Sequence, residues 1–138
     1  MASGPYYADL TSLLQSHYGS GTWRVTLVTN AYTPDLDNHD FWADASANEA
    51  TGTGYTAGGE IIVPTVAFNS TSNLFTVTFP VYTWSASTIT AAYAFYRKDT
   101  GDAATDNAGF LNDFGGDVSS TAGDFTVNAS NFTIDFPD

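Results

Sequence analysis

The chain has 138 residues, no cysteine, and fifteen acidic residues against three basic ones, which gives a formal charge of −12 at pH 7. Because phosphate backbones and anionic lipids are bound by clustered cations, this balance argues against nucleic-acid binding and against membrane attachment. Disulfides and thiolate metal sites are excluded, and the length predicts one β-rich domain over residues 1–138.

The first predicted element is a helix over about residues 4–18. Ser3 suits its N-cap, Pro5 suits its first turn, and Gly19 suits its end. This helix carries an apolar stripe at near-helical spacing, which consists of Tyr6, Leu10, Leu13, Leu14 and Tyr18. The stripe places Tyr6 in the core and leaves Tyr7 as a candidate for contact with a partner.

The rest of the chain shows the alternation of apolar and polar residues that is typical of half-buried strands. Strand patterns occur at residues 22–29, 60–68, 74–81, 88–98 and 110–114, and a closing pair, Phe125 and Val127 with Phe132, Ile134 and Phe136, flanks a predicted turn at 128–131. Pro64 predicts an edge strand or a bulge. About six to eight short strands predict a mainly β fold, a compact antiparallel sandwich or barrel with one N-terminal α-helix.

A long polar loop with embedded aromatic residues follows the first strand. Tyr32, Phe41 and Trp42 either anchor this loop to the core or contact a partner, since rings serve both purposes. The glycine run at 51–59 has the wrong order for a phosphate-binding loop. We expect glycines at positive φ there, packing Tyr55 against the sheet.

The same loop contains the oxygen-rich sequence Asp35, Asp37, Asn38 and Asp40, which resembles a calcium loop in ligand type. His39 stands where an oxygen ligand is expected and Asp40 where glycine is needed. An Asx-rich turn after Pro34 is therefore the favoured interpretation, and no metal ligand is assigned.

No complete catalytic set is present, so we expect no enzyme and no cofactor. His17 is expected at the helix C-terminus, where it favours the dipole or caps a carbonyl, and His39 on a surface loop. No serine occupies a G-x-S-x-G elbow. Fifteen acids leave a carboxylate pair of a small glycan hydrolase open. The segment 99–107 has the composition of a mobile loop.

Four segments appear in this order: VTLVTNAYTP (25–34), SANEATGTGYTAGG (46–59), TWSASTITAAYAFYRKDTG (83–101) and DFGGDVSSTAGDFTV (113–127). In residue pattern and in short stretches of sequence they resemble a family of small virion structural proteins of tailed bacteriophages. Members of this family are of the head-decoration, head-fibre, minor capsid or minor tail type. The resemblance implies a β-rich module on the outside of a virion. Because the chain lacks internal repeats, a tail-fibre shaft is disfavoured.

The resemblance therefore implies a non-enzymatic protein that binds the outer capsid surface and stabilises or decorates it. Its partners would be the major capsid protein or other virion proteins, and a homo-oligomer, a trimer included, stays open. Attachment would use either the N-terminal residues Tyr6, Tyr7 and Leu10 or the loop residues Tyr32, Phe41 and Trp42. The alternative is a minor tail or tail-tip module that binds a host receptor or glycan, with exposed Trp42 and Tyr32 stacking on sugars and calcium at Asp35, Asp37 and Asp40.

Overall fold

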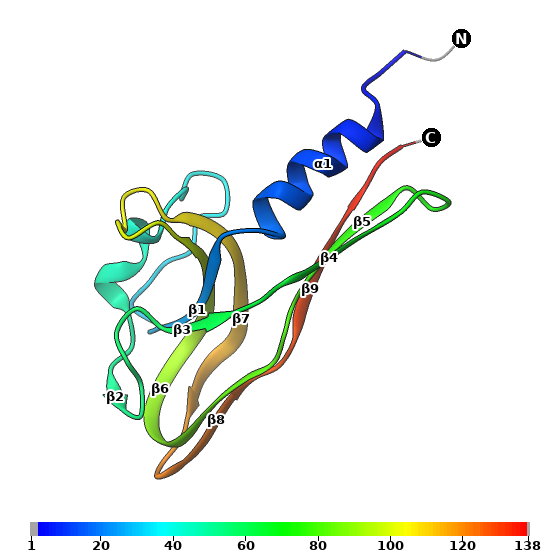
Figure 1. The fold of residues 1–138 in the computed structure, drawn as a ribbon. Coiled ribbons are helices and arrows are strands. Elements are labelled where there is room, and N and C mark those ends of the chain that lie inside the picture. The colour runs from blue at the N-terminus through cyan, green and yellow to red at the C-terminus, as the bar shows by residue number, and fades with distance from the viewer. Residues whose placement is uncertain (1–2, 138) are drawn as a thin grey trace.

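The computed structural model describes residues 3–137 (Figure 1). Its elements are α1 (Tyr7–Tyr18), β1 (Thr22–Val28), the short 3-10 helices η1 (Trp42–Asp44) and η2 (Ser46–Asn48), β2 (Gly52–Thr53), β3 (Glu60–Ile62), β4 (Thr65–Asn69), β5 (Leu74–Phe79), β6 (Tyr82–Asp99), β7 (Asn107–Ser119), β8 (Gly123–Val127) and β9 (Ser130–Asp135). The protein is mainly β, with antiparallel sheets packed together and an N-terminal helix, which confirms the predicted fold class.

The strands form two sheets. The larger has the order β2-β6-β1-β3, with β7 and β8 also paired to β6, and the smaller has the order β4-β5-β9. In Figure 1 the smaller sheet and α1 extend away from the body that the larger sheet forms with the loops. No helix in residues 3–137 is long and apolar enough to cross a bilayer.

One long antiparallel ribbon links the two sheets. The segment 74–99, containing β5 and β6, runs beside the segment 107–135, containing β7, β8 and β9, and the loop 100–106 closes it. The pairing follows the ribbon from end to end, through Leu74 with Asp135, Phe79 with Ser130, Tyr82 with Val127, Thr90 with Ser119 and Lys98 with Asn107. The two strands of the ribbon therefore pass from one sheet to the other by bending, and the chain does not reverse its direction at that point.

This arrangement corrects the predicted closing pair. There is no turn at 128–131, because β8 pairs with β6 and β9 continues the same path to pair with β5. Phe125 and Phe132 consequently lie in different sheets. The Asn and Ser residues of this segment mark a bend in the ribbon, and composition alone does not distinguish a bend from a hairpin.

Pro64 divides the strand predicted over 60–68 into β3 and β4. β3 pairs with β1 in the larger sheet, whereas β4 pairs with β5 in the smaller one. Both are edge strands, as predicted, because a proline has no N–H to donate to a ladder. Pro80 lies at the matching passage from β5 to β6.

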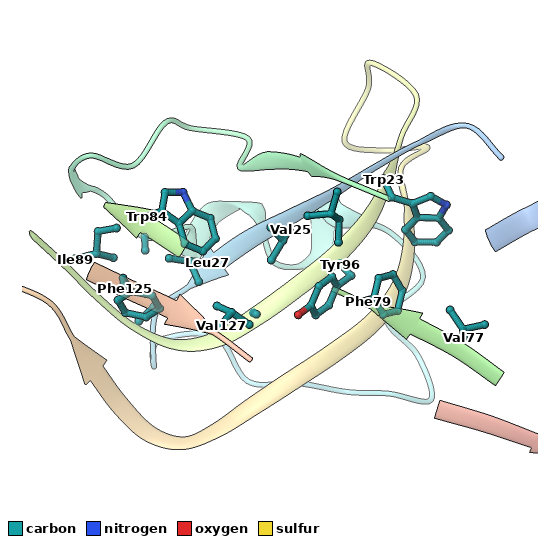
Figure 2. Packing of buried hydrophobic residues seen from close by; sticks show 14 of the residues in the cluster. Trp23, Val25, Leu27, Val77, Phe79, Trp84, Ile89, Tyr96, Phe125 and Val127 are labelled. Carbon is teal, nitrogen blue, oxygen red and sulfur yellow. The ribbon is translucent and has the colours of Figure 1, made fainter. Parts of the chain in front are cut away.

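The main core gathers side chains from β1, β6 and β8 of the larger sheet, joined by side chains of β5 from the smaller one (Figure 2). The predicted inward face of β1, Trp23, Val25 and Leu27, is buried, and Phe75, Val77 and Phe79 of β5 are buried beside it. Val81 was predicted on the same face but is exposed, because the ribbon bends after Phe79.

The helix packs with a different phase from the predicted one. It begins at Tyr7, and Tyr6 occupies the N-cap in place of Ser3. Tyr7 stacks on Phe136 with ring centroids 5.0 Å apart, whereas Tyr6 is 85% exposed. The expected roles of Tyr6 and Tyr7 are therefore reversed. The face against the core consists of Tyr7, Leu10, Leu14 and Tyr18, and Leu13 is exposed.

Gly19 ends the helix, as predicted. His17 does not cap it, since its ring packs edge-on against Tyr18 and Trp23 at centroid distances of 4.8 and 5.5 Å. The cation at this end is Lys98, whose Nζ donates a hydrogen bond of 2.6 Å to the carbonyl oxygen of His17. A Lys at the negative end of a helix dipole stabilises the helix, and here it also ties α1 to β6.

Candidate binding groove

The loop after β1 is anchored to the outer face of the larger sheet by its rings. Tyr32 and Trp42 are each 5% exposed and form a second core cluster with Val28, Ala45 and Phe95. The Trp42 ring lies 5.1 Å from that of Phe95, between centroids. Of the two interpretations of these rings, loop anchoring is the one that their burial supports.

Phe41 is half-buried and forms an isolated β-bridge with Asn107, so its backbone also ties the loop to the start of β7. The rings of Tyr32 and Trp42 are buried, so they expose little surface that a partner could contact. The expectation that Trp42 and Tyr32 are exposed and stack on sugar rings is therefore wrong, because the sheet face beneath the loop is apolar and needs covering.

The Asp35 segment is an Asx turn, as the favoured interpretation predicts. The Asp35 carboxylate accepts hydrogen bonds from the backbone N–H groups of Asp37 and Asn38, both at 3.2 Å, and from Asn38 Nδ2 at 2.9 Å. The hydrogen bond from the Asn38 side chain lowers the pKa of Asp35 below its usual value. This carboxylate is thus engaged within its own turn.

The glycine run holds Tyr55 against the sheet, as predicted. Gly52, Gly54, Gly58 and Gly59 have positive φ. The Tyr55 hydroxyl accepts a hydrogen bond of 3.0 Å from the Leu27 N–H and donates one of 3.2 Å to Glu49. Burial raises the pKa of Tyr55, so this donor remains protonated across the physiological range.

The loop 99–107, predicted as mobile, is tied to the core by Asp106. This carboxylate is buried and pairs with Arg97, and it also accepts 2.7 Å hydrogen bonds from the backbone N–H and the hydroxyl of Thr100. Arg97 in turn lies over the Trp42 ring, 5.6 Å from its centroid. A buried ion pair thus joins this loop to the aromatic loop.

Two adjoining hollows lie beside the aromatic loop, with volumes of about 140 and 260 Å³. They share Leu36, Gly109, Phe110 and Leu111 as lining residues. The first also contains Tyr32, Asp35, His39, Phe95 and Ala108, and the second contains Tyr18 and Phe132. We call the two hollows together the aromatic groove.

The walls of the aromatic groove are fixed by ring packing. Phe110 stacks on Phe132 at 5.7 Å between centroids, and Tyr18 packs edge-on against Phe132 at 5.4 Å. At the other end the Tyr32 hydroxyl and His39 Nδ1 are 2.8 Å apart and share a hydrogen bond. Leu36, by contrast, is 81% exposed at the rim. The groove therefore combines a rigid apolar wall with an unburied aliphatic side chain.

A larger hollow of about 510 Å³ lies where β7, β8 and β9 meet. Most of its lining is polar, from Asn112, Thr126, Asn128 and Ser130, and Asn112 Nδ2 already donates to the Ser130 hydroxyl at 2.9 Å. Because apolar burial supplies most binding free energy, the aromatic groove is the stronger candidate for a binding site.

The three basic side chains of the chain are all engaged inside the fold. Arg24 Nε lies 2.6 Å from Asp99 Oδ2, Arg97 pairs with Asp106, and Lys98 caps α1. The hydrogen bond from Arg24 lowers the pKa of Asp99 below its usual value. The remaining surface charge is therefore supplied by carboxylates.

Sequence reasoning placed Tyr32 in this region but missed the groove. Phe110 and Phe132 were predicted as strand residues, and Leu36 was not singled out. The available signal was a lone aliphatic residue between two aspartates in a turn. Of the N-terminal candidates, Tyr7 and Leu10 pack on the core, and Tyr6 is exposed at the far end of α1.

A scan against protein-family models, a search of curated proteins and a search of solved structures each found no match to this chain.

Proposed function

We propose that the chain is a non-enzymatic structural protein of a bacteriophage virion, which binds the outer surface of the capsid and stabilises or decorates it. Its partners are the major capsid protein or another virion protein. The proposal starts from the resemblance of four sequence segments to small phage virion proteins. It is supported by a mainly β module with an exposed, preformed apolar groove.

The observation that carries the proposal is how the chain uses its reactive side chains. His17 is packed between rings, His39 is bonded to Tyr32, and the Arg97–Asp106 pair holds two loops together. These groups serve the architecture, while Leu36 and the aromatic groove remain at the surface. This division of roles fits a protein that acts by attachment.

A lattice provides many copies of one contact, so a modest interface per copy gives firm attachment overall. A module that binds the assembled shell and not its dissociated subunits stabilises the shell by mass action. The proposal therefore predicts both binding and a stability effect. The tail-tip alternative relies on exposed Tyr32 and Trp42 rings that stack on sugars, whereas each of these residues is 5% exposed.

The test uses purified phage particles assembled without this chain. Added protein should bind saturably, at a fixed ratio to the major capsid protein, and should raise the temperature at which the particle releases its DNA. Labelling confined to tails would support the tail module instead. Absence of binding to any part of the particle would refute the proposal.

A further inference from the structure

We propose that the aromatic groove is the attachment site, and that it receives an apolar side chain from a partner polypeptide in which lysine or arginine residues flank that side chain. This inference rests on the proposed function in that the partner is a virion protein. The chemistry of the occupant, however, is argued from the groove and its surroundings.

The wall of the aromatic groove is apolar and preformed. Phe110, Phe132 and Tyr18 hold one another in place, so the wall exists before any partner arrives. A preformed site avoids the entropic cost of ordering side chains on binding. The two hollows, about 140 and 260 Å³, accommodate a side chain, and the exposed Leu36 lines both of them.

The rim of the aromatic groove is acidic, and this charge favours a partner that carries cations. Asp35 lines the groove, and exposed Asp37 and Asp40 lie next to the lining residues Leu36 and His39. The three basic side chains are engaged elsewhere, with Asp99, with Asp106 and with the end of α1. None of the three lysine and arginine side chains therefore balances the carboxylates at the rim, where His39 is the neighbouring basic side chain, and cations of a partner would do so.

The same charge disfavours a second copy of this chain as the occupant. A copy carries the same net charge of −12 and has no unengaged basic side chain to offer. Like charges brought together across an interface oppose association. Complementarity therefore points to a different, basic polypeptide.

The first experiment measures the groove directly, with three synthetic peptides as probes and the amide NMR spectrum of the full chain as the readout. The peptides are acetyl-Lys-Lys-Leu-Lys-Lys-amide, its Glu-Glu-Leu-Glu-Glu counterpart, and a Lys-Lys-Gly-Lys-Lys counterpart. The basic leucine peptide should give saturable shifts at Leu36, His39 and residues 109–111. The acidic and glycine peptides should bind about tenfold more weakly or not at all.

The second experiment measures binding to particles that lack the chain. Leu36→Lys should weaken binding about tenfold or more, because it removes an apolar contact and adds a repelling cation. Val63→Lys carries the same change at another exposed aliphatic residue and should bind like wild type. Asp37→Asn combined with Asp40→Asn should flatten the salt dependence of binding, whereas Asp124→Asn combined with Asp135→Asn should not.

The outcomes separate the two proposals. If the basic leucine peptide occupies the groove but the particle does not bind the chain, the groove inference stands and the virion function fails. If the particle binds wild type and Leu36→Lys equally well, the groove inference fails and the virion function stands. Loss of particle binding in Leu13→Lys alone would move the attachment site to α1 and overturn the inference. Equal shifts with all three peptides would also overturn it.

Discussion

At the scale of single residues, buried groups at the ends of the ribbon decide how the loops are held. Asp106 is 1% exposed and its carboxylate satisfies Arg97 and Thr100. Burying a charge is costly unless it is paired and hydrogen-bonded. The Asp106 carboxylate therefore helps to tie the closing loop to the body, although the composition of the loop is that of a flexible segment.

Replacing this acid tests its role. Asp106→Asn keeps the shape of the side chain but removes the buried carboxylate partner of Arg97 and leaves the more distant Asp99, 3.5 Å away. We expect a loss of about 3 kcal/mol or more in the free energy of unfolding, measured by urea denaturation. The matched control is Asp102→Asn in the same loop, where the side chain is exposed and a change of at most about 0.5 kcal/mol is expected. Equal effects of the two variants would contradict this role for Asp106.

Gly109 is a second residue whose identity is dictated by close approach. A Cβ at this position would lie 2.6 Å from Cη2 of Trp23, whose ring is held by Tyr18 and Phe79. Gly109→Ala should therefore cost about 1–3 kcal/mol of unfolding free energy, because the ring cannot move aside. Gly123→Ala, a strand glycine with ordinary clearance, is the control. A wild-type melting temperature for Gly109→Ala would show that the ring yields.

Neither Asp106 nor Gly109 could be identified from the sequence. Gly109 depends on Trp23, which lies far along the chain, and Asp106 depends on Arg97 across the closing loop. Alternation of apolar residues does not report either contact. Tyr55 shows the opposite case. Its position within a glycine run predicted close packing, because glycines permit a backbone approach that other residues obstruct, and the structure confirms it.

At the scale of elements, contacts with the core determine which face of α1 is buried, and strand pairing determines the path of the ribbon. The apolar stripe predicted for α1 was off by one residue at its start, since Tyr6 and Tyr7 are adjacent rings and periodicity alone does not choose between them. Tyr7 faces the core because its ring stacks on that of Phe136. The strands of the ribbon were largely predicted. The changes of sheet at Pro64, which precedes the ribbon, and at 128–129 within it were not predicted.

The C-terminal end of α1 predicts a pH dependence. Burial, and next the charge of Lys98, lower the pKa of His17 below its usual 6.5. The unfolded chain therefore takes up a proton at a higher pH than the folded one, so this residue's contribution to stability is complete above pH 6.5 and declines as the pH falls through and below that value.

The measurement compares urea unfolding of wild type and His17→Phe at about pH 7.5 and at about pH 5.5. The variant keeps a ring against Trp23 but does not titrate. Wild type should lose more unfolding free energy than the variant between the two pH values. Identical losses in both proteins would show that His17 does not protonate with a penalty in the folded state.

At the scale of the whole molecule, net charge affects the stability of the folded chain and its association with other molecules. The formal charge is −12 and the basic side chains are engaged internally. Self-repulsion of this kind destabilises the compact state and opposes self-association, and salt screens it. Raising the NaCl concentration from about 0.01 to about 0.3 M should therefore raise the melting temperature by a few degrees. A melting temperature that falls with salt would mean that the internal ion pairs outweigh the repulsion.

Composition and alternation were sufficient to predict a mainly β chain with one N-terminal helix, because both are properties of local sequence. The aromatic groove was not predictable in the same way. It is assembled from the end of α1, the loop around Leu36, and strands β7 and β9, which lie far apart along the chain. Its charge environment, by contrast, was visible in the count of acids and bases.

We propose above all that this chain is attached to the outside of a virion. The most direct measurement is a cryo-electron microscopy difference map between particles assembled with the chain and without it. The account predicts added density on the outer capsid surface, repeated with the lattice, into which the β body fits with Leu36 and the aromatic groove facing the shell. Identical maps, with the chain absent from purified particles by mass spectrometry, would contradict it.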